Sequence, residues 1–73
     1  MDIHIFSTNV QKVKDALNLT NLLRLYFRLR DVNFDLGDFR QGEEMILRIE
    51  SENLQPVRIV QAMNDLGYEC KPL

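Results

Sequence analysis

Few side chains in this sequence could bind a metal ion. Cys70 is the only cysteine and His4 the only histidine, and they stand near opposite ends of the chain. A zinc or copper site requires several thiolate, imidazole or thioether ligands, usually at short and recognisable spacing. Met63, a further sulfur, falls in the apolar stripe of a predicted helix. We therefore predict no metal site and interpret Cys70 as a small, half-buried strand residue.

The hydroxyl and carboxylate side chains form no catalytic pattern either. Ser7 and Thr8 form no recognisable nucleophile–histidine pattern, and helix capping accounts for both. Solvated strand and turn positions account for the acidic residues around the predicted central hairpin, which are Asp35, Asp38, Glu43 and Glu44. The sequence also lacks the glycine-rich phosphate-binding patterns. We expect no catalytic residue, no cofactor and no enzyme activity.

The composition indicates one small globular domain that covers residues 1–73. Of the 73 residues, 45% are hydrophobic and 27% are charged, which is ordinary for a folded domain. The net charge of −2 lacks the basic excess of proteins that bind nucleic acids or anionic membranes. The apolar runs are far too short to span a bilayer. The lone thiol and the absence of a leader-like start favour the cytoplasm.

The chain begins with a strand pattern and a helix-start pattern. Ile3, Ile5 and Phe6 indicate a short strand. Thr8 and Gln11 are three residues apart and fit a capping box, in which each side chain accepts a hydrogen bond from a backbone N–H of the helix start. We therefore predict that a helix begins next to this strand.

The following segment predicts a helix from about Asn9 to about Leu29. Its apolar residues recur every three or four positions in one stripe, formed by Val13, Ala16, Leu19, Leu23 and Tyr26. No glycine or proline interrupts the segment. However, Leu22–Leu29 also alternates well enough to form a strand, and this alternative stays open.

The middle of the chain predicts a β-hairpin. Val32–Leu36 and Met45–Glu50 both alternate apolar with polar residues, which is typical of half-buried strands. Between them, Gly37–Glu43 contains two glycines, which suit a hairpin loop with positive φ values.

The last part predicts a second helix and a closing strand. Asn53 can cap the helix and Pro56 is tolerated in its first turn, while Gly67 suits the left-handed residue after its end. Tyr68–Leu73 then forms a short strand. The complete order is strand, helix, strand, strand, helix, strand. It predicts an α+β, ferredoxin-like βαββαβ sandwich with a four-stranded antiparallel sheet and two helices on one face.

Four segments at matching separations resemble the heavy-metal-associated domain family of small copper chaperones and metal-ATPase modules. Phe6–Val10 is similar to the family's entry from first strand to loop, and Val32–Leu36 and Met45–Glu50 to its second and third strands. The best local likeness is Ile59–Tyr68, which resembles the family's second helix and the Gly-Tyr pair that ends it.

The metal-binding motif of that family is missing here. The resemblance places its Cys-x-x-Cys loop near the start of the first helix, where this chain has Lys12 and Asp15. A protonated ammonium group cannot bind a metal, and a single carboxylate does not make a soft two-coordinate site. The resemblance therefore implies the fold and a degenerate loop, without the metal chemistry.

The first helix carries more apolar residues than one buried stripe requires. Leu22, Leu25 and Leu29 are the residues that we expect at an interface, because a helix that is apolar on more than one side is either deeply buried or meets a partner. This favours self-association or docking to another protein. The competing explanation is that Leu22–Leu29 is a strand.

Three classes of function remain open. The first is a non-catalytic protein-interaction or regulatory module on a degenerate heavy-metal-associated fold. The second is copper or zinc binding or transport through a non-standard or intermolecular site that uses Cys70. The third is a small-molecule-sensing regulatory domain, which rests on analogy with other domains of the same topology.

Overall fold

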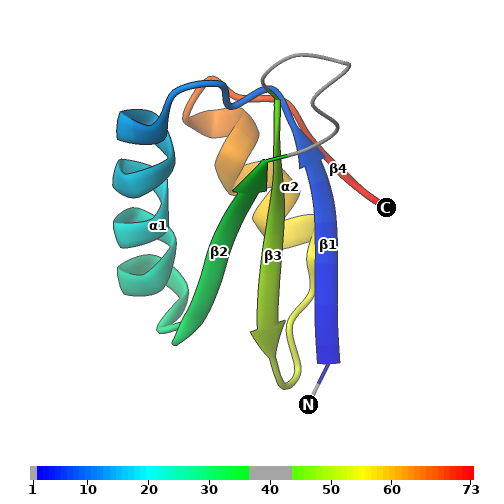
Figure 1. The fold of residues 1–73 in the computed structure, drawn as a ribbon. Helices are drawn as coiled ribbons and strands as arrows, with labels where there is room; N and C mark the ends of the chain where they lie inside the picture. The colour runs from blue at the N-terminus through cyan, green and yellow to red at the C-terminus, as the bar shows by residue number, and fades with distance from the viewer. Residues whose placement is uncertain (1, 37–43) are drawn as a thin grey trace.

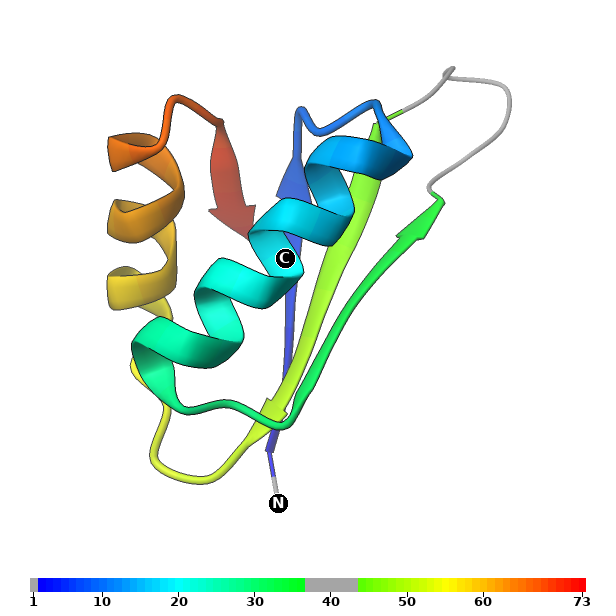
Figure 2. The same ribbon diagram turned by 90° about the vertical axis from the view of Figure 1, so that its left-hand side faces the viewer.

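The computed structural model describes residues 2–36 and 44–73, so the predicted hairpin loop Gly37–Glu43 lies outside the described residues. The elements in chain order are β1 (Asp2–Thr8), α1 (Val13–Phe27), β2 (Asp31–Leu36), β3 (Met45–Ser51), α2 (Pro56–Asp65) and β4 (Cys70–Pro72), as Figure 1 shows. The strands form one sheet in the order β2-β3-β1-β4, and every neighbouring pair is antiparallel. Both helices lie on the same side of the sheet (Figure 2). The predicted α+β architecture is confirmed, and it is compatible with a ferredoxin-like fold.

The core lies between the sheet and the two helices. On β3, Met45, Leu47 and Ile49 are buried, while the residues between them are only partly buried, as the alternating pattern predicts. Leu47 stands opposite Phe6 of β1 on one side and opposite Phe34 of β2 on the other. The helices complete the core with five buried side chains, which are Ala16, Leu19, Leu23, Ile59 and Met63.

β1 turns its larger apolar residue toward the helices. Phe6 is fully buried, whereas Ile3 is 58% exposed and Ile5 is 40% exposed on the opposite face of the sheet. Successive side chains of a strand point to opposite faces, so only one of these two sets can be buried. Thr8 lies on the same side as Phe6 and is also buried.

The capping box predicted for Thr8 and Gln11 is wrong. Thr8 is the last residue of β1, and its hydroxyl group donates a hydrogen bond of 2.6 Å to the carbonyl oxygen of Met45. The same Oγ1 accepts a bond of 3.3 Å from the Val10 N–H. Thr8 therefore ties β1 to β3 and to the following loop, and the helix begins later than expected, at Val13.

The segment that could have been a helix or a strand is helical up to Phe27. Arg28 then adopts a left-handed conformation with φ 55°, and the Leu29 N–H donates a hydrogen bond of 3.0 Å to the Arg24 carbonyl oxygen. This turn directs Leu29 into the core, where it is 8% exposed. The strand alternative for Leu22–Leu29 is thus wrong, and the predicted end at Leu29 was about two residues too late.

The second helix begins at Pro56, so the prediction of proline in its first turn is confirmed. Asn53 is not the cap, because the residue before the helix is Gln55. Asn53 instead has φ 58°, a left-handed conformation that asparagine tolerates better than most residues. Gly67 follows the helix with φ 94°, as predicted, and the Tyr68 N–H returns to the Met63 carbonyl oxygen at 2.9 Å.

Candidate interaction surface

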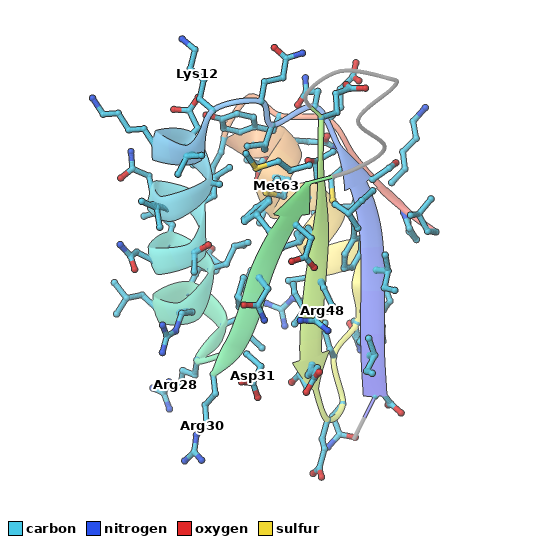
Figure 3. All side chains as sticks on the ribbon, in the orientation of Figure 1. Lys12, Arg28, Arg30, Asp31, Arg48 and Met63 are labelled. Atoms are coloured by element: carbon cyan, nitrogen blue, oxygen red, sulfur yellow. The ribbon has the colours of Figure 1, made fainter. Side chains whose placement is uncertain are left out.

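The loop that the family resemblance assigns to metal binding has no metal-ligand set. Lys12 is the exposed residue before α1, and Figure 3 shows it at the outer end of that helix, while Asp15 lies in the first helical turn. Asn9 accepts a hydrogen bond of 2.9 Å from the Glu69 N–H, which brings the start of β4 to this loop. Among residues 2–36 and 44–73, no group of three or more His, Cys, Asp or Glu side chains could hold a metal ion.

The thiol and imidazole side chains are separated in the fold. Cys70 stands opposite Thr8 and is 4% exposed, and Met63 is fully buried in the core (Figure 3). His4 stands opposite Ile49, four residues from Thr8 along β1, which is roughly 13 Å at the usual strand rise. The imidazole of His4 and the thiol of Cys70 therefore do not converge within this chain.

The Cys70 thiol is a poor ligand and a poor nucleophile in the folded chain. Burial raises its pKa from the ordinary 9.0 to about 11, because the apolar surroundings disfavour the thiolate. The thiolate is the form that binds metals and attacks electrophiles. An intermolecular metal site at Cys70 would first require this residue to become exposed.

We expect iodoacetamide to modify Cys70 at least about a hundredfold more slowly in the native protein at pH 8 than in the urea-unfolded protein, since two pKa units reduce the thiolate fraction about a hundredfold. Because folding raises the pKa of Cys70, the thiol of the unfolded chain loses its proton at a lower pH than the thiol of the folded chain. The free energy of unfolding should therefore fall as the pH rises from 9.0 toward 11. Mass spectrometry of timed samples measures the two rates. Equal rates would show that Cys70 is accessible.

The predicted interface residues on α1 have different locations. Leu22 is 47% exposed and Leu25 is 80% exposed, so both are available for contact. Leu29 is buried and cannot take part without unfolding of its turn. Tyr26, which the sequence pattern placed in the core stripe, is instead 78% exposed and belongs to this surface.

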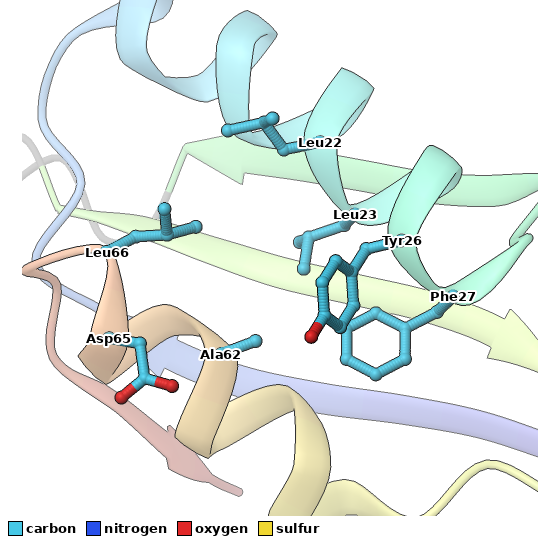
Figure 4. Close-up of a pocket in the computed structure, with 7 residues that line it drawn as sticks. All are labelled: Leu22, Leu23, Tyr26, Phe27, Ala62, Asp65 and Leu66. Atoms are coloured by element: carbon cyan, nitrogen blue, oxygen red, sulfur yellow. The ribbon is translucent and has the colours of Figure 1, made fainter.

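An apolar hollow lies between α1 and α2, and we call it the interhelix groove. Its volume is about 170 Å³, and Figure 4 shows the residues around it, which are Leu22, Leu23, Tyr26, Phe27, Ala62, Asp65 and Leu66. A cavity of about 150 Å³ lined by similar residues is large enough for benzene. The interhelix groove can therefore receive one aromatic or aliphatic side chain.

Aromatic contacts shape one end of the interhelix groove. The rings of Tyr26 and Phe27 meet edge to face, with their centroids 5.1 Å apart. The Arg58 guanidinium group from α2 lies 5.9 Å from the centroid of Phe27, within the range of a cation–π contact. The wall at this end is therefore formed by both helices.

The other broad face of the protein is the open face of the sheet. Ile3 and Ile5 are exposed there, but they lie next to charged residues. Arg48, opposite Ile5, has its Nε atom 3.7 Å from a carboxylate oxygen of Asp35 on β2. This mixture of charge and apolar surface makes the open face less suitable for burial than the helix face.

Comparison with known proteins adds no family to this description, because no family model, no curated protein and no solved structure matches the chain. Within the part of the chain that the structure describes, neither helix has the length and apolar character needed to cross a membrane.

Proposed function

We propose that this chain is a non-catalytic protein-interaction module on a ferredoxin-like fold, and that it self-associates through the face formed by α1 and α2. The observation that carries the proposal is the combination of an apolar groove with protruding apolar side chains on one face. Leu25 and Tyr26 are the most exposed large apolar residues of the described chain, at 80% and 78%, and Tyr26 lines the interhelix groove. Burying such a surface in an interface is favourable, and the free energy gained is roughly proportional to the apolar area buried.

A second copy of the chain suits this face because the face contains both a hollow and side chains that can fill one. In a two-fold dimer the same patch of each copy meets the other, so a protruding Leu25 or Tyr26 can enter the partner's groove. A stable interface needs about 800 Å² from each partner, which is about 15% of the 5389 Å² surface of this chain.

The charges along α2 are also self-complementary. Arg58 and Asp65 are seven residues apart, which places them on the same side of the helix and about 10.5 Å apart along its axis. When two such helices pack antiparallel about a two-fold axis, Arg58 of each copy approaches Asp65 of the other. Ala62, midway between them, is small enough to let the two helices come close.

We extend this proposal to the origin of the scaffold, which we relate to the heavy-metal-associated domains. Its support is the order of elements together with the position of Lys12 and Asp15 at the start of α1, where those domains carry their thiolates. Lys12 and Asp15 give this loop one cation and one carboxylate but no soft metal ligand. In this proposal the helix face, and not the loop, performs the function.

Sedimentation equilibrium over a range of protein concentrations tests self-association. We expect a dimer that dissociates on dilution, and we expect Tyr26→Glu to weaken it at least about tenfold, because a charge would be buried in the contact. Leu17→Glu is the matched control, since Leu17 is 60% exposed on the same helix but does not line the interhelix groove. A monomer at about 1 mM would overturn self-association.

A charge exchange tests the two-fold arrangement itself. Arg58→Glu and Asp65→Lys should each weaken the dimer, because each places like charges opposite one another. The double variant should recover most of the lost affinity, since both pairs are restored with reversed sign. If the double variant is as weak as the two changes combined, the antiparallel α2 contact is incorrect.

A further inference from the structure

The two edges of the sheet differ in length and in their capacity to pair. β4 has three residues and includes Pro72, which has no N–H to donate. β2 has six residues without a proline, and it is the outermost strand on the other side (Figure 2). Short strands and prolines are common ways to prevent further pairing at an edge. β4 has this protection and β2 does not.

The outer edge of β2 has free backbone groups. In an antiparallel pair, alternate residues bond to the neighbour while the others direct their N–H and C=O groups outward. β3 occupies the inner side of β2, over the pairs from Asp31 with Glu50 to Leu36 with Met45. In the described part of the chain, no backbone bond outside this ladder involves β2. The outward groups can therefore bond to an added strand.

A hollow with a mainly apolar lining lies beside this edge, between α1 and β2, and we call it the edge groove. Its volume is about 310 Å³, and its lining includes Val13, Leu17, Val32, Phe34 and Met45. Val13 and Leu17 are 65% and 60% exposed and belong to the first half of α1, which lies nearest this part of the sheet in Figure 2. Every second side chain of an added strand would point toward the helix layer and enter the edge groove.

The opposite face of β2 carries two acidic side chains. Asp31 and Asp35 point to the open face, both are exposed, and Asn33 lies between them. Asp35 is 3.7 Å from Arg48, whereas Asp31 forms no ion pair within the described residues. The side chains of an added strand that face this side would therefore be favoured when they are Lys or Arg.

The same carboxylates disfavour a second β2 as the occupant. Residues that stand opposite in an antiparallel pair lie on the same face, so a two-fold β2 pair must be centred on one residue. Centred on Asn33, it places Asp31 opposite Asp35 twice. When the pair is centred on Phe34, the Asp35 carboxylates of the two copies are diagonal neighbours across the two strands. Both arrangements bring like charges together, which destabilises the pair.

We infer that the β2 edge binds an extended segment of another protein that alternates apolar and basic residues. The segment pairs with β2 through its backbone, places its apolar side chains in the edge groove, and places its Lys or Arg side chains toward Asp31 and Asp35. This site is separate from the helix face proposed for self-association.

A fluorescent eight-residue peptide of alternating Lys and Val tests this inference. We expect saturable 1:1 binding by fluorescence anisotropy, with amide chemical-shift changes confined to β2 and the first half of α1. Two further peptides carry N-methyl groups on alternate backbone nitrogens, one on the odd-numbered and one on the even-numbered residues. Only one of these two sets of N–H groups pairs with β2, so methylating that set should abolish binding. Binding that survives both methylated forms, or no saturation up to about 1 mM, would overturn the inference.

Three variants locate the site on the protein. Leu17→Gln should weaken peptide binding at least about tenfold, whereas Leu25→Gln, on the same helix but outside the edge groove, should change it less than about twofold. Asp31→Asn should weaken the Lys peptide and improve binding of a matched Glu peptide. Equal effects of Leu17→Gln and Leu25→Gln would contradict the edge groove. Because Leu25 belongs only to the dimer face, loss of dimerisation and loss of peptide binding are distinguishable.

Discussion

Replacing Phe6 with alanine is expected to lower the free energy of unfolding by about 3–5 kcal/mol. Phe6 is fully buried in the centre of β1, opposite the equally buried Leu47, so truncation removes a large apolar side chain and leaves a cavity. A domain of 73 residues has a total stability of about 4–11 kcal/mol. The change therefore removes a large fraction of the stability, and urea unfolding followed by circular dichroism measures it.

Ile5→Ala is the matched control, because Ile5 is the next residue on the same strand and points to the open face. It is 40% exposed, and we expect its truncation to cost less than about 1 kcal/mol. If Ile5→Ala were the more destabilising change, β1 would have the opposite face against the helices, and every side-chain assignment on that strand would be reversed.

The Thr8→Val variant is expected to lose about 2–4 kcal/mol of stability, although valine has nearly the same shape as threonine. The Thr8 hydroxyl donates to the Met45 carbonyl oxygen and accepts from the Val10 N–H, and Thr8 is only 6% exposed. Valine removes both hydrogen bonds and leaves two backbone groups without that partner. Thermal unfolding of the variant should show a lower midpoint with an unchanged secondary-structure spectrum at low temperature.

Thr20→Val serves as the comparison for Thr8→Val. The Thr20 hydroxyl donates to the Ala16 carbonyl oxygen within α1, at 2.8 Å and only partly buried, so water can replace part of this interaction. We expect a change within about 1 kcal/mol. Similar losses for both variants would mean that the Thr8 hydrogen bonds add nothing beyond those of an ordinary threonine.

The sequence by itself predicted the elements and their order, because periodicity is a local property, but it left Leu22–Leu29 open as a helix or a strand. The alternation in Met45–Glu50 identified β3, and the turn residues Pro56 and Gly67 bounded α2. Apolar residues every three or four positions identified α1. The sequence also has more leucines on α1 than one buried stripe needs, which indicated that Leu22 and Leu25 would lie outside the core. Both are exposed in the structure.

Only the tertiary structure decided which face of each element is buried and which side chains form the two proposed interaction surfaces. Whether β1 buries Phe6 or its isoleucines depends on the partner layer, since both sets alternate equally well. Thr8 looked like a helix cap because its Met45 partner is 37 residues away in the chain. Tyr26 fitted the stripe of α1 but lies at the margin where α2 does not cover it, and Leu29 is buried because the left-handed turn at Arg28 redirects it. The two grooves depend on spaces between elements, which no local pattern encodes.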